Sequence, residues 1–318
     1  MPSPRAVYRV DITGRDGSRQ PTPEYGVCSV DQSSSAMMLP VPPSSELALT
    51  EKYPPVKFST FKDLRKIVAS QYKKLSDGDE NQHLSFSHVT PKQFETIEEH
   101  RVDLGRGVSF TYFGDIETLI IKLPSQVHER AHCMFGERMV RAVTAMQLGP
   151  EEFAGYGATK YVGENASSKE GDSSWKNLRV RSNKGDWPTL VIEAGMSESM
   201  PRLHTDARWW IEHSAGKVNI VLLIWIRPSI KAIKIEKWVP GAAPVTKTSS
   251  CLRSNAFPTL TEEITIDQSN TPSVIKGTPL RLEFDKIFDR PANPPVEQDV
   301  VFSSQDLDDW TRWLWVGL

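Results

Sequence analysis

The sequence has few cysteines and no long apolar run, and each shortage excludes a class of protein. Its cysteines, Cys28, Cys133 and Cys251, are odd in number and widely spaced, which suits neither a disulfide framework nor a cysteine-ligated zinc cluster. No apolar stretch is long enough to span a bilayer, and the N-terminus lacks the layout of a signal peptide. We therefore expect an intracellular protein, nuclear or cytoplasmic, with reduced thiols and no membrane association.

The sequence also lacks an excess of either charge. It contains 38 Lys and Arg against 40 Asp and Glu, a formal net charge of -2. A nucleic-acid-binding surface would therefore have to be a local basic patch, because the chain as a whole has no net positive charge. With 318 residues and 38% hydrophobic content, the chain is long and apolar enough to bury a core.

Changes in composition divide the chain into four parts. The first is rich in Ser and Pro and is expected to be poorly ordered or draped over the body. A helical lead-in follows, then a core, then a C-terminal extension that packs on the core and ends in a helix from Ser304. The four parts are residues 1–57, 58–100, 101–240 and 241–318.

Apolar periodicity predicts the elements of the core. Alternating and unbroken apolar runs predict strands, whereas residues repeating at three and four positions predict amphipathic helices. The predicted order is two strands, a helix, a hairpin, a second helix, a buried strand and an alternating edge strand. The clearest segments are 107–124 for the first two strands, 127–146 and 197–216 for the helices, and 188–195, 217–228 and 229–239 for later strands.

The first core helix opens with the motif H-E-x-x-H. His128, Glu129 and His132 have the spacing by which a zinc metallopeptidase places two imidazoles on the metal and a carboxylate against its water. That function needs a third ligand, but the nearest acids, Glu151 and Glu152, directly follow a helix-ending Gly-Pro pair. We therefore expect the histidines to share no third protein ligand. His128 would support a site or be solvated, and His132 would be partly buried by packing.

Two acids later in the core predict a different metal site. Asp172 begins one predicted strand and Glu193 ends the next, so a hairpin would bring both carboxylates to one end of the sheet. Converging carboxylates suit Mg²⁺ or Mn²⁺, which take oxygen ligands. Glu193 ends an apolar run, where an unpaired buried charge would be costly, so a partner or a metal is expected there.

The chain resembles the PD-(D/E)XK nuclease superfamily, and within it a group numerous in fungal genomes. The resemblance implies an α/β fold, a restriction-endonuclease-like mixed sheet flanked by helices, with N- and C-terminal extensions. It also implies that Asp172 and Glu193 bind the metal, that Glu129 adds an acid, and that the protein hydrolyses phosphodiester bonds. The matching segments, in order, are HERAHCMF, KEGDSSWKN, WPTLVIEAGMSES, LHTDARWWIEHSAGKVNIVLLIWI and FDKIFDRP.

The sequence departs from the superfamily pattern at one position. A lysine is expected two residues after the second acid, and Gly195 stands there instead. Lysine in that role stabilises charge on the attacking water and the phosphate, so another basic group must replace it. We predict that Arg208, or else Arg202, points from the following helix towards the two carboxylates.

A local basic group follows Asp172 and is the candidate for binding substrate. Lys176, Arg179 and Arg181 lie where a phosphate backbone would run, although a solvated strand face explains them equally well. Ser197 is a further substrate-binding candidate, and it is also a suitable helix cap.

Two rival functions remain open from the sequence. One is a catalytically inactive module that keeps the fold and binds nucleic acid or protein. The other is the zinc metallopeptidase. The sequence fixes neither the oligomeric state, for which a homodimer is one option, nor the choice between DNA and RNA as partner.

Overall fold

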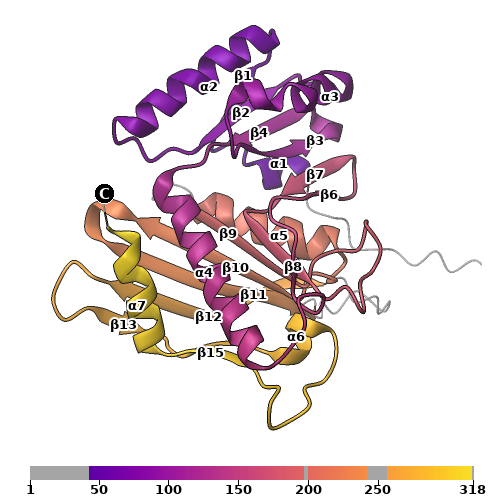
Figure 1. Ribbon diagram of the computed structural model, residues 1–318. Helices are drawn as coiled ribbons and strands as arrows, with labels where there is room; N and C mark the ends of the chain where they lie inside the picture. Colours follow the sequence, from indigo (N-terminus) through magenta and orange to yellow (C-terminus); the bar gives the residue numbers. More distant parts are fainter. Residues whose placement is uncertain (1–42, 197–199, 243–255, 317–318) are drawn as a thin grey trace, which may run out of the picture. The chain divides into compact units, whose positions relative to one another are not determined.

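The computed structural model describes residues 43–196, 200–242 and 256–316 as a mixed α/β fold with two large sheets (Figure 1). Neighbouring strands in the first sheet are antiparallel except for the parallel pair β1 and β2. Across this sheet the order is β1 (Val56–Lys57), β2 (His83–Ser87), β4 (Thr118–Lys122), β3 (Ser109–Phe113), β7 (Ser167–Glu170) and β6 (Lys160–Val162).

Two helices pack on the first sheet. α2 (Phe61–Ser76) and α3 (Pro91–Glu99) bury an apolar stripe against β3 and β4. Thr90 forms a capping box with Gln93, and the next residue, Pro91, has no N–H to leave unsatisfied, which fixes the start of α3. The short helices η1 (Arg101–Leu104) and η2 (Gly114–Ile116) lie in the connections before β3 and β4.

The second sheet is mixed. β9 and β10 are parallel neighbours, and the other pairs are antiparallel. Its order is β13 (Val274–Lys276), β12 (Phe257–Asp267), β11 (Ala232–Gly241), β10 (Ile220–Arg227), β9 (Leu190–Met196), β8 (Ser173–Lys176) and β5 (Ala154–Gly155). A separate pair is formed by β14 (Leu280–Leu282) and β15 (Val300–Phe302).

Helices cover both faces of the second sheet. Leu190 and Ile192 of β9 belong to the core of α4 (Gln126–Ala145), whereas Val191 belongs to the core of α5 (Met200–His213). Successive strand residues point to opposite faces, so β9 is buried on both and its sequence is apolar throughout. α7 (Ser304–Leu314) lies beside α4 (Figure 1), with Trp310 against Phe135, so the predicted C-terminal helix is confirmed.

The predicted fold class is confirmed, because helix α4, hairpin β8–β9, helix α5 and parallel strand β10 follow one another as expected. β11, predicted at an edge, is interior because β12 pairs along its length, and β12 itself comes from the predicted C-terminal extension. The predicted helical lead-in also contributes β2 to the first sheet. The remaining elements are α1 (Ser44–Ala48), η3 (Pro228–Ile230) and α6 (Phe284–Phe288).

The predicted Ser/Pro-rich arm is described only from residue 43 onward. There α1 buries Leu47 and Ala48 against the core of α5. Within the described ranges, no helix combines the length and apolar character needed to cross a bilayer.

Candidate functional site

Asp172 lies where the chain passes from the first sheet to the second. β7 ends in one sheet and β8 begins in the other, with only Gly171 and Asp172 between them. A β-carbon on Gly171 would approach side-chain atoms of Trp210 and Val191 to 3.1 Å. Glycine therefore permits the close passage that places Asp172 at the junction.

The register of the β8–β9 hairpin places Glu193 beside Asp172. Ser173 pairs with Ile192 across these antiparallel strands, so the next residues along the ladder are cross-strand neighbours. Their side chains are almost entirely covered, with 4% of Asp172 and 1% of Glu193 exposed. The two carboxylates therefore converge, in agreement with the geometry expected of the hairpin.

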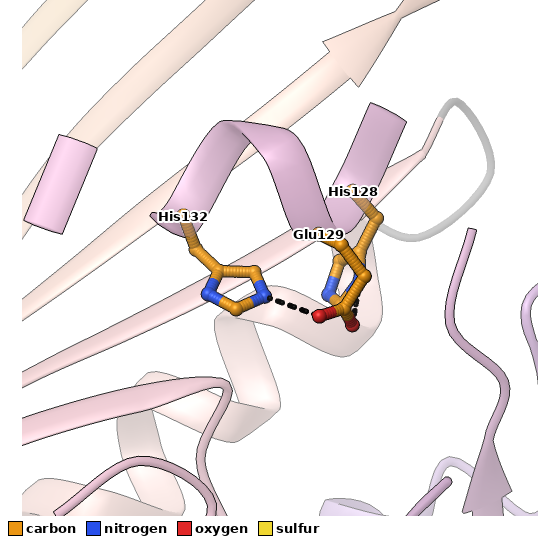
Figure 2. Close-up of side chains that lie close together, drawn as sticks. All are labelled: His128, Glu129 and His132. Carbon is orange, nitrogen blue, oxygen red and sulfur yellow. Dashed lines mark ion pairs between the residues drawn. The ribbon is translucent and has the colours of Figure 1, made fainter. Parts of the chain in front are cut away.

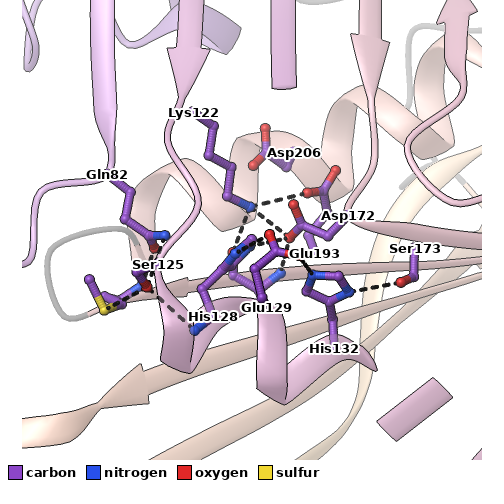
Figure 3. Close-up of polar contacts among 12 residues, drawn as sticks. Gln82, Lys122, Ser125, His128, Glu129, His132, Asp172, Ser173, Glu193 and Asp206 are labelled. Carbon is purple, nitrogen blue, oxygen red and sulfur yellow. Dashed lines mark hydrogen bonds and ion pairs between the residues drawn. The ribbon is translucent and has the colours of Figure 1, made fainter. Parts of the chain in front are cut away.

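The ammonium group of Lys122, the last residue of β4, lies between the two carboxylates (Figure 3). Its Nζ is 2.7 Å from Asp172 Oδ2 and 3.7 Å from Glu193 Oε2. It also donates a 2.6 Å hydrogen bond to the carbonyl oxygen of Ala194. Three oxygen atoms of the hairpin thus surround one positively charged atom.

A second lysine approaches Glu193 from β7. Lys169 Nζ is 3.3 Å from Glu193 Oε1 and 2.8 Å from Asp206 Oδ1 on α5. Trp210 Nε1 donates a 2.7 Å hydrogen bond to the same Glu193 oxygen. Burial opposes the charge of Lys169, but the attraction of Asp206 and Glu193 outweighs it, and the pKa of Lys169 is raised.

The two converging acids differ in pKa. Burial opposes ionisation of Asp172, but the nearby His128 and Lys122 hold its pKa well below its usual range. Burial raises the pKa of Glu193 to about 7; Lys169 opposes this shift and Asp172 reinforces it. Such a pair, with one acid charged and the other titrating near neutrality, is common where acid–base chemistry or metal binding occurs.

The H-E-x-x-H motif occupies the first turns of α4, and its three side chains face one another (Figure 2). The Glu129 carboxylate lies 3.3 Å from His128 Nδ1 and 3.4 Å from His132 Nε2. Contacts with His128 and His132 lower the pKa of Glu129 to about 2. Among the described residues, the carboxylate that faces both rings is that of Glu129, which belongs to the motif itself and is not the separate third ligand that a zinc peptidase needs.

The other sides of the two imidazoles face the start of β8. His128 Nε2 is 2.9 Å from Asp172 Oδ2, and His132 Nδ1 forms a 2.9 Å hydrogen bond with Ser173 Oγ. Burial opposes protonation of His132, but Cys133, Glu129 and Asp172 outweigh it and raise its pKa to about 10. His128 is therefore a buried supporting residue, and His132 is held by polar contacts as well as packing.

The predicted arginine substitutes do not reach the carboxylates. Arg208 lies 3.4 Å from Glu46 on α1. Arg202 donates to the carbonyl oxygen of Ala48, and its guanidinium lies 5.0 Å from the centre of the Tyr53 ring. The prediction that either arginine contacts the two acids is wrong among the described residues, since α5 turns both towards the segment 44–53. The positive charges come from β4 and β7 instead.

Two members of the predicted basic group are structural. Lys176 is fully buried and donates to the backbone carbonyls of Asn183 and Asp186. Arg181 pairs with Asp289 and donates to backbone carbonyls at Trp187, Pro188 and Lys217. Their predicted role as a phosphate-binding face is wrong, because the chain turns both side chains inward to hold loops.

The remaining candidate residues do not contact Asp172 or Glu193, or they lie outside the residues that the structure describes. Arg179 is exposed and pairs with Glu151, whereas Glu152 pairs with Arg290. Neither glutamate therefore supplies a ligand to the histidines. Ser197 lies outside the described residues.

Sequence reasoning missed Lys122. It noted Lys169 near Asp172 and Asp206 on the following helix, but it did not pair Lys169 with Glu193 and Asp206. Lys122 ends the apolar run TLIIK, where a lysine in a buried strand needs a partner. That partner lies fifty positions away, so no local pattern identifies it.

Comparison with known proteins adds little to this geometry. No protein-family model and no curated protein matches the chain. A solved structure of a candidate nuclease belonging to DUF820 from Anabaena variabilis is similar at 11% sequence identity and a TM-score of 0.34. The similarity covers 64% of this chain and 90% of that one. A TM-score of this size does not define a shared fold.

Proposed function

We propose that the protein is a divalent-cation-dependent phosphodiesterase that cleaves nucleic acid. The observation that carries the proposal is the set of oxygens around Lys122 Nζ, contributed by Asp172, Glu193 and the Ala194 carbonyl. Carboxylate and carbonyl oxygens are the ligands that Mg²⁺ and Mn²⁺ take in proteins. The hairpin already surrounds a positive charge at this point, which fits a hard cation.

Asp172 and Glu193 would hold the ion together with the carbonyl oxygen of Ala194. When bound, the ion would polarise a phosphoryl oxygen and lower the pKa of the attacking water. Glu129 would supply a third carboxylate on the solvent-exposed side of the site. Its side chain is 46% exposed, whereas those of Asp172 and Glu193 are covered. Substrate would therefore approach past Glu129.

Lys122 and Lys169 would perform the task of the lysine missing at Gly195. Both ammonium groups contact the carboxylate cluster, at 2.7 Å from Asp172 for Lys122 and 3.3 Å from Glu193 for Lys169. With the site occupied, Lys122 would leave these oxygens, and its positive charge would remain on β4 beside the two carboxylates. Fixed positive charge at this place stabilises the charge that develops during hydrolysis.

This function agrees with the resemblance to the PD-(D/E)XK superfamily and its fungal group, which we retain as the proposed ancestry. A zinc peptidase is not favoured, because the Glu129 carboxylate faces both imidazoles and the acids at 151 and 152 are paired elsewhere.

One observation favours a second candidate, a nucleic-acid- or protein-binding module without catalysis. Lys122 already neutralises the two carboxylates, as expected of a structural ion-pair cluster that needs no metal.

The proposal predicts cleavage of nucleic acid only in the presence of Mg²⁺ or Mn²⁺. The purified full-length protein is incubated with labelled single- and double-stranded DNA and RNA, with each ion or with a chelator, and products are resolved on gels. Asp172→Asn should be inactive, whereas Lys66→Ala, at an exposed position on α2, should match the wild type. If the wild type binds these substrates but cleaves none, the binding module replaces the nuclease.

The pKa of Glu193 predicts how cleavage depends on pH. Below about 7 the carboxyl is protonated and attracts a cation weakly, so cleavage should rise steeply through pH 7. The free energy of unfolding of the metal-free protein should instead fall as the pH rises. The folded state holds the Glu193 proton more tightly than the unfolded state, so this contribution is lost as the pH rises through 7. Initial rates of the wild type across this range test the first trend, and chemical denaturation of the metal-free wild type and of Glu193→Gln tests the second. A flat rate profile contradicts the assignment.

A further inference from the structure

The two histidines of the H-E-x-x-H motif carry ring nitrogens that are buried without hydrogen bonds. His128 is 2% exposed and His132 is 5% exposed. The ring nitrogens that face Glu129, His128 Nδ1 and His132 Nε2, have no hydrogen-bond partner among the described residues, and the Glu129 carboxylate lies 3.3 and 3.4 Å from them. Buried polar atoms in this state are unusual in folded proteins and often mark a ligand or an ion.

We propose that His128, Glu129 and His132 bind a divalent transition-metal ion at a second site, which adjoins the proposed phosphodiesterase site and shares Glu129 with it. One ligand atom from each residue can be chosen so that all three lie within 4.8 Å of one another. His128 Nδ1 and His132 Nε2 are the nitrogens that face the Glu129 carboxylate (Figure 2). Helical spacing of four residues places both rings on one side of α4.

The surroundings of the rings match those of metal-binding histidines. Such a histidine usually directs its second ring nitrogen to a carboxylate, hydroxyl or carbonyl, which fixes the orientation of the ring. Here the second nitrogen of His128 faces Asp172 at 2.9 Å, and that of His132 is hydrogen-bonded to Ser173 at 2.9 Å (Figure 3). The consecutive residues Asp172 and Ser173 therefore hold both rings towards Glu129.

The donor set selects the class of metal. Two imidazoles and one carboxylate suit Zn²⁺, Co²⁺ or Fe²⁺, whereas Mg²⁺, Mn²⁺ and Ca²⁺ favour oxygen ligands. The oxygens around Lys122 favour Mg²⁺ or Mn²⁺, so the two sites should bind different ions. The half-exposed Glu129 side chain offers the ion a route from solvent.

Titration of the chelator-treated, full-length protein with Co²⁺ tests the proposal, because Co²⁺ absorption reports its ligands. We expect one Co²⁺ per chain, retained in excess Mg²⁺ and in Glu193→Gln, which removes the other proposed site. His132→Ala should weaken binding by more than about 100-fold, beyond the effect of losing a supporting residue.

Two further variants test whether a loss of Co²⁺ binding is specific to the proposed ligands. Glu129→Gln changes a half-exposed side chain, so it should fold normally and still bind Co²⁺ far more weakly than the wild type. His204→Ala removes another histidine that pairs with a glutamate, Glu236, and should bind Co²⁺ like the wild type. The proposal is overturned if the wild type binds no Co²⁺, if Glu129→Gln binds it unchanged, or if Mg²⁺ or Glu193→Gln abolishes binding.

Discussion

Lys122→Met is expected to lower the free energy of unfolding of the metal-free protein by about 3 to 5 kcal/mol, the usual cost of removing one partner from a buried ion pair. The substitution leaves the Asp172 and Glu193 carboxylates, with 4% and 1% of their side chains exposed, without the cation that lies between them. Mn²⁺ should restore the lost stability, because an ion can take the position of the ammonium group.

Lys122→Met should bind Mn²⁺ more tightly than the wild type, because the ammonium group no longer competes with the ion for the carboxylates. It should also cleave more slowly, because the positive charge that stabilises the developing charge is lost. Thermal denaturation with and without Mn²⁺, calorimetric titration and the cleavage assay measure the three effects. Lys122→Arg keeps the charge and should retain most of the stability.

Lys176→Met is the matched control for Lys122→Met. Lys176 is likewise a buried lysine, but its hydrogen bonds go to the backbone carbonyls of Asn183 and Asp186. Its removal should destabilise the protein without creating a metal site, so Mn²⁺ should not restore stability. Equal recovery of both variants in Mn²⁺ would show that the ion acts elsewhere and would remove the support for a cation site at Asp172.

Local sequence patterns predicted the elements that carry the acids. α4 and α5 show apolar residues at helical spacing, and β9 shows the unbroken apolar run of a strand covered on both faces. Because antiparallel register follows from a hairpin, the approach of Asp172 to Glu193 could also be predicted.

The groups that neutralise these acids could not be predicted in the same way. Lys122 comes from a different sheet, fifty positions before Asp172, so only the tertiary fold brings its ammonium group to the hairpin. The nearest basic residues in sequence lie on α5, the helix after Glu193, but both of its arginines point towards the segment 44–53. β11 was misplaced at an edge for a related reason: its partner β12 is largely polar and carries a weak strand pattern.

Glu193→Gln and Asp206→Asn should separate a metal-binding acid from one that only balances charge. Glu193 faces Lys122, Lys169 and Trp210, whereas Asp206 contacts Lys169 Nζ at 2.8 Å. Glutamine has nearly the shape of glutamate, and its carbonyl oxygen can still accept the hydrogen bond from Trp210. We therefore expect Glu193→Gln to fold but to lose cleavage and Mn²⁺ binding entirely.

Asp206→Asn should instead reduce cleavage by about 10- to 100-fold, the range typical of residues that support a metal ligand. The aspartate holds Lys169 against Glu193, so its loss should alter the position of that charge without removing a ligand, and high Mn²⁺ should restore part of the rate. Rates measured over a Mn²⁺ series distinguish the two variants. If Mn²⁺ rescues Glu193→Gln as fully as Asp206→Asn, Glu193 is no ligand, and the oxygens around Lys122 form a structural ion-pair cluster instead of a catalytic site.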